Sequence, residues 1–426
     1  TKGSKMKKPF IIILISFISF KSTSQEAINS NFDFIHQNIS SKYLNESVKL
    51  VISLPQNYSS SKGKYPVVYI LDGKWFFSQG VSSQIHFSRF KMTPEMIIVG
   101  IENSRRQRAW YHQDTKKFNQ FLEKELLPSI NKKFRTNNER LLFGWEISGG
   151  FVIECLGTSL NLFTGYLAAS PGPLDKTFME AYQYRFESIK ALLKSNNSIN
   201  SFFYFTTGKS DYPAQYGVDN MYNLLSESRV ENFRWNYNKL REETHSTTGF
   251  KTIHNGIEAY FKYYSVLRFK TIEEYLSKGG IEYLDFYYAK RKEKYKFSKE
   301  KNTTDFLQSC KNIVFTAMST KNYSVFDLHV KLFLPKNMLS ITHYNHASMF
   351  AEYYLKNNNT RMAMKLMSYY IDKFPETARP YAVLGNIYKQ MGDKKNAKKN
   401  YLKAINLGTK NEDRRLSEYK NNLKQL

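Results

Sequence analysis

The sequence predicts an α/β fold, in which helices cover both faces of a mostly parallel sheet, followed by an all-α domain of helical repeats. Short apolar runs that end in polar turns alternate with stretches of helical spacing through the first 268 residues, as is typical of parallel sheets. Helical spacing alone continues through residues 341–426. A chain of 426 residues also exceeds one ordinary hydrophobic core, so we expect one large and one smaller domain.

The chain starts with the pattern of an export signal. Lysines follow Met6, an apolar run covers residues 10–20, and small residues occupy positions 22–24. The apolar run is about half as long as the ~20 residues that a membrane-spanning helix needs. We therefore predict a cleaved signal peptide over residues 6–24, a periplasmic or secreted protein, and no stable membrane span after cleavage.

Buried strands are predicted where apolar residues run together or alternate. They cover residues 47–55, 65–71, 96–101, 141–143, 164–169, 202–206 and 233–239. Polar turns follow these strands and should meet at one rim of the sheet, where open α/β sheets bind their ligands. Apolar residues also repeat at helical spacing over residues 118–134, and Pro128 should kink or break that helix. We predict that this first domain covers residues 25–268.

One stretch has the pattern of a sharp turn from a strand into a helix. In residues 141–152 an apolar run passes through small residues into renewed apolar residues, like the elbow that holds the nucleophile in α/β-hydrolases. That elbow expects Gly-x-Ser-x-Gly. Counted from Gly144, this chain has Glu146 in place of the serine and Ser148 in place of the second glycine.

Several segments resemble, in order and in approximate spacing, the esterase D-type "putative esterase" family of α/β-hydrolases. They are residues 65–73, 98–103, 118–136, 141–151, 166–171, 208–211 and 243–261. The resemblance covers most of residues 42–265 and implies an α/β-hydrolase fold. It implies hydrolysis of a carboxylic ester or a related acyl bond in a small molecule. It also implies a catalytic triad, in which Asp211 matches the acid and His245 matches the histidine.

Glu146 stands where this family has its serine nucleophile, and three interpretations are open. In related folds a carboxylate at the elbow attacks an alkyl carbon. Glu146 and His245 together would instead activate a water molecule by general base catalysis. In the third interpretation the elbow is inactive and Glu146 forms a salt bridge with His245. The chain is then a binding or scaffold protein that uses the old site or the repeats.

Two further residues offer alternatives within the same site. Ser148 is an alternative nucleophile, because Ser148-Gly149-Gly150 also contains Ser-x-Gly. Its position two residues after the turn places it at the start of the following helix, so its side chain should point away from the site. Glu243, just before His245, is an alternative acid.

The resemblance also implies backbone N–H groups that would bind a carbonyl oxygen in two turns. Gly73 and Lys74 follow a buried strand, and Ile147 follows Glu146. N–H groups at such positions stabilise the negative charge that develops on the carbonyl oxygen during acyl transfer.

A basic run over residues 105–108 contains three arginines. They either form a solvated basic loop, which the sequence favours, or bind an anionic group by bidentate contact, with Arg105 as the candidate residue. The remaining histidines have no metal-ligand spacing with Cys or acidic residues, so we predict no metal and no cofactor. The formal net charge is +26, but the lysines are spread along the whole chain. We therefore expect a solvated basic surface and no nucleic-acid partner.

Residues 341–426 carry a tetratricopeptide pattern. The positions that its two packed helices require are occupied by Tyr381, Leu384, Gly385, Tyr388, Ala397, Tyr401 and Ala404. A weaker copy lies about 34 residues earlier, and residues 411–425 suggest a capping helix. Since two repeats are fewer than the roughly three of a free solenoid, they should pack on the first domain or on the helical connecting segment 269–340. The repeats also suggest a protein partner.

Overall fold

The structure is a computed structural model, and it describes residues 34–176, 179–211, 217–333 and 343–426. The predicted signal peptide, residues 6–24, lies outside the described residues. The chain forms two compact units. Among the described residues, the first unit contains those of residues 34–84 and 96–253, and the second contains those of residues 85–95 and 254–426.

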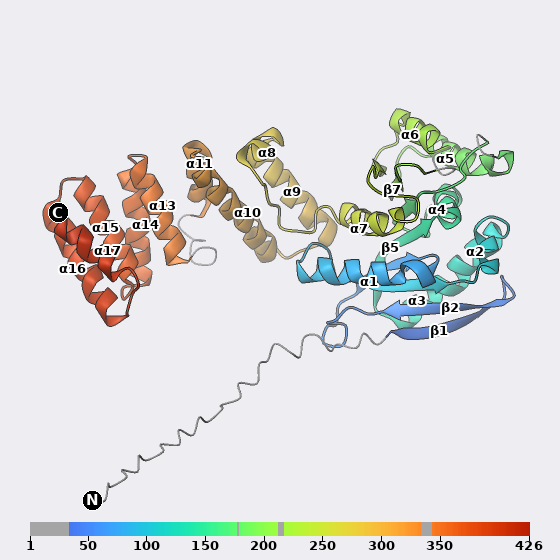
Figure 1. Cartoon of the computed structure of the whole chain (residues 1–426), viewed down its shortest axis with the longest axis horizontal. Coiled ribbons are helices and arrows are strands. Elements are labelled where there is room, and N and C mark those ends of the chain that lie inside the picture. Colours follow the sequence, from blue (N-terminus) through green and yellow to red (C-terminus); the bar gives the residue numbers. More distant parts are fainter. Residues whose placement is uncertain (1–33, 177–178, 212–216, 334–342) are drawn as a thin grey trace, which may run out of the picture. The chain divides into compact units, whose positions relative to one another are not determined.

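The first unit alternates strands and helices (Figure 1). Its strands are β1 (Ile35–Ser41), β2 (Glu46–Ser53), β3 (Tyr65–Ile70), β4 (Ile97–Glu102), β5 (Thr136–Trp145), β6 (Gly165–Ala169), β7 (Phe202–Thr207) and β8 (Arg234–Lys239). Its helical segments are α1 (Gly73–Arg89), η1 (Arg106–Tyr111), α2 (Thr115–Phe121), η2 (Leu122–Leu126), α3 (Leu127–Lys133), α4 (Ile147–Thr158), η3 (Glu180–Tyr182), α5 (Gln183–Ser195), α6 (Val218–Glu227) and α7 (Thr248–Tyr260). The ends of α1 and α7 extend into the second unit.

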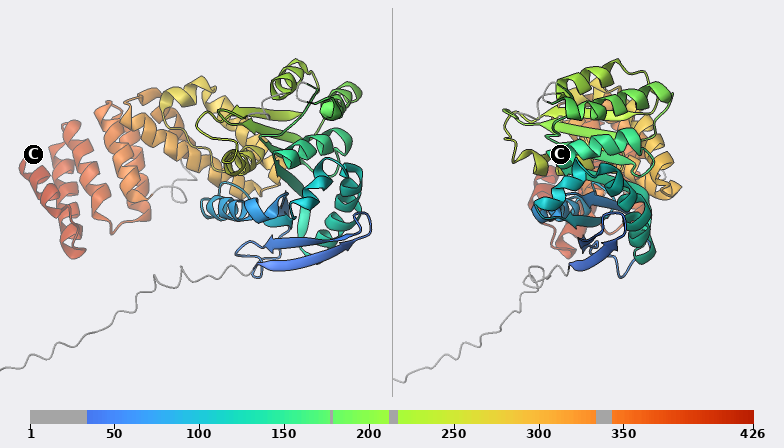
Figure 2. Two further views of the ribbon diagram at one scale, coloured as in Figure 1. Left: turned by 45° about the vertical axis from the view of Figure 1, so that its right-hand side comes forward. Right: turned by 90° about the vertical axis from the view of Figure 1, so that its right-hand side faces the viewer.

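The described strands form one sheet in the order β1-β2-β4-β3-β5-β6-β7-β8. β2 runs antiparallel to β1 and to β4, and the other neighbouring pairs are parallel. Ile70 of β3 lies opposite Phe143 of β5, so the turns after these two strands emerge at the same edge. The predicted mostly parallel sheet is confirmed, and Figure 2 shows helices on both sides of the strands.

Side chains of the central strands alternate between the two faces of the sheet, as the period of two requires. On one face, Tyr69 of β3 belongs to a core that includes Phe118 of α2 and Phe151 of α4. On the other face, Phe76 of α1 packs edge-on against Phe143 of β5, with ring centroids 5.4 Å apart. Burial on both faces explains why these strands appear in the sequence as continuous apolar runs.

The helix predicted around Pro128 is interrupted. α2 ends at Phe121, the π-helical turn η2 follows, and α3 begins at Leu127 with Pro128 in its first turn. Proline is tolerated there because the first N–H groups of a helix have no intrahelical partner.

The second unit is helical in its described part. It contains α8 (Ile272–Ser277), α9 (Gly280–Tyr295), α10 (Lys299–Ser319), α11 (Tyr323–Phe333), α13 (Tyr344–Lys356), α14 (Thr360–Lys373), α15 (Ala378–Gln390), α16 (Lys394–Lys410) and α17 (Leu416–Lys424). One core joins Phe269 and Leu284 to Phe350 of α13 and Val383 of α15. The repeats therefore pack on the segment that precedes them, which is one of the two arrangements expected.

α15 and α16 form the helix pair that the tetratricopeptide pattern predicts. Ala397, Tyr401 and Ala404 of α16 are buried. A Cβ on Gly385 of α15 would lie 2.6 Å from two ring carbons of Tyr401, so the helices approach this closely only because residue 385 is glycine. The tyrosine hydroxyl donates a hydrogen bond to Asn386 Oδ1 at 2.7 Å.

The first unit ends at Ile253, whereas the sequence analysis places the end of the first domain at residue 268. Residues 254–268 group with the helical unit. Among the described residues, no helix combines the length and the apolar character that crossing a membrane requires.

Candidate active site

Glu146 occupies the turn between β5 and α4. Its backbone has φ 56° and ψ −118°, a strained combination for a non-glycine residue that persists only where neighbouring structure holds it. Its N–H donates to the carbonyl of Ala169 at 3.0 Å, and its own carbonyl accepts from the N–H of Gly150 at 2.9 Å. The turn is thus anchored to β6 and to α4, while 36% of the Glu146 side chain remains exposed.

Gly144 and Ser148 shape the inner side of this turn. A Cβ on Gly144 would lie 2.3 Å from the carbonyl oxygen of Ser148, so only glycine lets α4 begin this close to β5. Ser148 is fully buried. Its hydroxyl donates to Asp72 Oδ2 at 2.7 Å and accepts from the N–H of Trp145 at 2.8 Å. Ser148 therefore points into the protein, away from the exposed tip.

His245 and Asp211 form a hydrogen-bonded pair. Asp211 follows β7, His245 follows β8, and the imidazole Nδ1–H donates to Asp211 Oδ1. Asp211 is fully buried and also accepts from the Ser170 hydroxyl and from the N–H of Gly208 at 2.8 Å. Burial alone would raise the pKa of Asp211, but these three hydrogen bonds outweigh it and hold the pKa below its ordinary value.

The second nitrogen of His245 faces the elbow. Nε2 lies 4.0 Å from Glu146 Oε1, and 26% of the histidine side chain is exposed. The hydrogen bond to Asp211 is the main cause that raises the pKa of His245. Burial acts in the opposite direction, and the charge of Glu146 adds to the increase. The imidazole is therefore more basic than a free histidine.

Arg108 of η1 lies between two carboxylates. Its Nε donates to Asp72 Oδ1 at 3.1 Å, and a terminal nitrogen lies 3.0 Å from Glu146 Oε2. Burial would lower the pKa of Arg108, but the charges of Asp72 and Glu146 outweigh it and raise the pKa. Asp72 itself is buried, which raises its pKa although Arg108 and Ser148 lower it. One charged guanidinium is thus shared between Asp72 and the Glu146 carboxylate at the tip of the elbow, and it offsets part of their negative charge.

Two tryptophans flank this arginine. The guanidinium carbon lies 5.1 Å from the ring centroid of Trp75 and 5.7 Å from that of Trp145. Trp75 is 52% exposed, and Trp145 Nε1 donates to the carbonyl of His245 at 2.8 Å. The tryptophans therefore fix the positions of Arg108 and His245 and leave an indole surface open to solvent.

Two helices begin at the same edge of the sheet, and the backbone N–H groups of their first residues are hydrogen-bond donors. Gly73 and Lys74 open α1 after β3, and Ile147 opens α4 after the adjacent strand β5. The first N–H groups of a helix have no intrahelical partner and carry part of the positive end of its dipole. The predicted donors therefore lie at the edge of the sheet that carries Glu146.

A family comparison agrees with this arrangement. The profile of the family described as "Putative esterase" matches residues 41–260, which is more than half of the chain. The chain belongs to this esterase family. A tetratricopeptide-repeat profile matches residues 378–407, covering α15 and most of α16. Among curated proteins, none matches the chain.

The chain is also similar to several solved structures. An IroE-like serine hydrolase from Shewanella oneidensis is 21% identical with a TM-score of 0.51, over 70% of this chain and 98% of that one. An uncharacterised protein from Capnocytophaga ochracea is 17% identical with a TM-score of 0.48, and the match covers 88% of this chain and 94% of that protein. The enterobactin esterase FES from Shigella flexneri is 15% identical with a TM-score of 0.45, and the match covers 55% of this chain and 60% of that protein. The first of these likenesses establishes a common fold and no more.

Within this esterase fold, the basic loop contributes a different arginine from the one predicted. Arg105 is exposed, and in the described part of the chain its side chain forms no ion pair with Asp72 or Glu146, unlike that of Arg108. Arg106 is paired with Glu46 at the surface, at 2.9 Å. Arg108 is the member that turns inward. Because η1 is a short 3₁₀ helix, neighbouring residues point in different directions, and the sequence alone did not single out Arg108.

The acid partner of the histidine is Asp211 rather than Glu243. The Glu243 carboxylate lies 3.9 Å from Lys251 Nζ, and Asp211 accepts the hydrogen bond from the imidazole. Asp72 joins the site without having been predicted as a side-chain contributor. Its position directly after a buried strand was the available signal. The described residues contain no group of three or more His, Cys, Asp or Glu side chains arranged to hold a metal ion.

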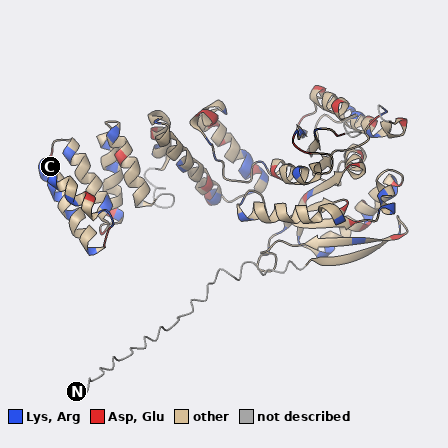
Figure 3. Cartoon of the chain, viewed as in Figure 1, with Lys and Arg blue, Asp and Glu red and all other residues tan. Residues whose placement is uncertain are grey.

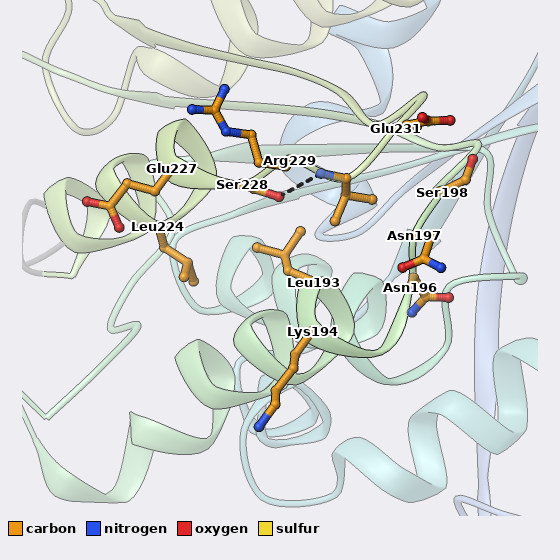
Figure 4. Close-up of a pocket in the computed structure, with 11 residues that line it drawn as sticks. Leu193, Lys194, Asn196, Asn197, Ser198, Leu224, Glu227, Ser228, Arg229 and Glu231 are labelled. Atoms are coloured by element: carbon orange, nitrogen blue, oxygen red, sulfur yellow. Dashed lines mark hydrogen bonds between the residues drawn. The ribbon is translucent and has the colours of Figure 1, made fainter.

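The esterase unit also has a hollow of about 580 Å³ between the ends of α5 and α6 (Figure 4). Leu193 and Leu224 line it, together with the turns that precede β7 and β8. Asp211 and His245, in contrast, follow the carboxyl ends of these parallel strands. The hollow therefore lies at the opposite edge of the sheet and takes no part in this site.

Proposed function

We propose that this chain hydrolyses a carboxylic ester or a related acyl bond in a small molecule, with water rather than a side chain as the nucleophile. The observation that carries the proposal is the position of His245 Nε2, 4.0 Å from Glu146 Oε1, while Asp211 orients the ring. This separation is too long for a direct hydrogen bond, and one water molecule can bind both atoms.

In the proposed reaction, neutral His245 removes a proton from the bridging water as the oxygen attacks the carbonyl carbon. Glu146 accepts the other O–H of the water and orients it. Asp211 keeps the proton of His245 on Nδ1 and stabilises the imidazolium that forms. The N–H groups of Ile147 and Gly73 stabilise the oxyanion, and His245 then returns the proton to the leaving alcohol.

Arg108 reduces the electrostatic repulsion that the Glu146 carboxylate would exert on the oxyanion of the reaction. A negative charge beside the developing oxyanion would oppose it, and loss of a single oxyanion donor already costs about 3 kcal/mol. The guanidinium, 3.0 Å from the Glu146 carboxylate and shared with Asp72, offsets part of this negative charge. Hydrolysis is therefore compatible with Glu146, at a rate below that of a serine esterase.

The test is hydrolysis of a series of nitrophenyl esters by the purified chain. Glu146→Gln should lower kcat by roughly 10- to 100-fold, and His245→Gln by at least as much, because water activation is lost. Glu123→Gln, which changes the same type of side chain on η2, should stay within about twofold. Equal rates for the wild type and Glu146→Gln would contradict the proposal.

A second candidate is a binding protein without turnover, and the ion pair between Arg108 and Glu146 favours it because that pair occupies the tip of the elbow. This candidate expects no hydrolysis of any ester in the series by the wild type. Glu146→Ser, which places a hydroxyl near His245, should then create esterase activity.

We also propose that the esterase is exported. The support is the basic start, the apolar run of residues 10–20 and the small residues that follow. Expressed with its natural start in a Gram-negative host, the mature protein should be periplasmic and begin near Gln25. Amino-terminal sequencing that finds Met6 retained on a cytoplasmic product would overturn this.

A further inference from the structure

Lysines are concentrated along α16 (Figure 3). Six of the 17 residues of this helix are lysine, and the helix contains no Asp or Glu. Lys395, Lys398, Lys399 and Lys403 are exposed and follow the spacing of one helix face, which we term the basic face. The opposite side of α16 is buried in the repeat.

The lysines of α16 differ from the Lys331 side chain of α11 in how they pair with acidic side chains. On α11, for example, Lys331 pairs with Asp327 one turn away, at 2.6 Å. Among the residues that the structure describes, the lysines of α16 have one ion pair, between Lys410 and Glu376 at 3.3 Å. Like charges four residues apart destabilise a helix, and Lys399 has such a neighbour on both sides. The basic face thus has an electrostatic cost that α16 does not offset within its own sequence.

A hollow of about 460 Å³ adjoins the basic face between α15 and α16. Tyr381 of α15 and Leu402 of α16 line it together with Lys399 and Lys403. Leu402 is 48% exposed, and Lys403 Nζ lies 5.9 Å from the ring centroid of Tyr381. An apolar side chain surrounded by carboxylates would match this combination of apolar floor and lysine rim.

We propose that the basic face binds an acidic segment of a protein partner, with one apolar or aromatic side chain of that segment in the hollow. Charge complementarity identifies the partner as acidic. A membrane surface fits less well, because a helix that binds in the lipid interface needs a broad exposed apolar face. The apolar side of α16, with Tyr401 and Ala404, is instead buried in the repeat.

The test uses the purified full chain and a fluorescein-labelled peptide of about twelve residues, rich in Asp and Glu with one central Phe. Lys395→Gln/Lys399→Gln/Lys403→Gln should weaken binding about tenfold at low salt, by removing three charge contacts. The matched control Lys62→Gln/Lys64→Gln/Lys132→Gln removes the same charge from exposed positions of the other unit and should change binding less than about twofold.

A second pair of measurements isolates the hollow. Replacing the central Phe of the peptide by Ala should weaken binding to the wild type, whereas Leu402→Ala should reduce this difference. If the two triple Lys→Gln variants lose the same amount of peptide affinity, the basic surface binds nonspecifically and the proposal is overturned. Binding to phosphatidylcholine–phosphatidylglycerol vesicles that the α16 triple abolishes, without peptide binding, would also overturn it in favour of a membrane surface.

Discussion

At the scale of single residues, the balance of charge around Glu146 determines what the site can do. Arg108 is shared between Asp72 and Glu146, so one positive charge faces two carboxylates. His245 lies within reach of the remaining negative charge, and its pKa is raised mainly by the hydrogen bond to Asp211 and further by Glu146. The imidazole must be neutral to act as a base, so the rate of hydrolysis should rise with pH through a midpoint above 6.5.

The titration of His245 provides a prediction at this scale. Glu146→Gln removes a negative charge that favours the imidazolium, so the midpoint of His245 should move to lower pH. NMR of the imidazole C–H signals, assigned with His245→Gln, measures this directly. Glu123→Gln should leave the midpoint where it is. An unchanged midpoint in Glu146→Gln would mean that the two side chains do not interact in solution.

The sequence located some of these residues and missed others for physical reasons. Asp211 and His245 were found through the resemblance of residues 208–211 and 243–261 to the esterase family. Arg108 was not separated from Arg105, because the direction of a side chain in a short 3₁₀ turn depends on tertiary packing. The role of Asp72 depends on Ser148 and Arg108, which are distant in sequence and lie beside it only in the folded protein.

At the scale of secondary-structure elements, close packing explains where glycine is required. Gly385 faces the ring of Tyr401, where a Cβ would lie 2.6 Å from ring carbons. Gly408 of α16 would place its Cβ 3.4 Å from Leu416 and Tyr419, an ordinary contact. The two glycines therefore differ in packing although both lie inside helices of the same repeat.

This difference predicts opposite effects of the same substitution. Gly385→Ala should destabilise α15 and α16 by about 1–2 kcal/mol, because overpacking exceeds the gain of about 1 kcal/mol in helix propensity. Gly408→Ala should be neutral or stabilising by up to about 1 kcal/mol. Hydrogen exchange of the α15 and α16 amides measures the change in stability that each of the two substitutions causes. Equal protection in the two variants would contradict the packing argument.

The elements themselves were predicted to different extents. The central strands were found because burial on both faces gives continuous apolar runs, such as that of β3. β1 was missed because its sequence, IHQNISS, alternates half-buried and exposed residues without a strong apolar pattern. It is recognisable only through its antiparallel pairing with β2.

At the scale of the whole molecule, the chain combines an esterase unit with a helical unit that ends in a tetratricopeptide repeat. Each unit has its own core, one around β3 and α4 and the other from Phe269 to Ile387. The sequence placed the first boundary at residue 268 because residues 243–261 resemble the esterase family. Contacts within the folded chain place it at Ile253.

The central claim concerns the proposed reaction of the whole molecule, namely that water attacks the ester without a covalent acyl intermediate on the protein. Its most direct test is the intact mass of the protein, quenched during turnover of a nitrophenyl ester. The account predicts release of nitrophenol with no change in the mass of the protein. A mass increase equal to the acyl group, mapped by peptide analysis to Ser148 or Glu146, would contradict it.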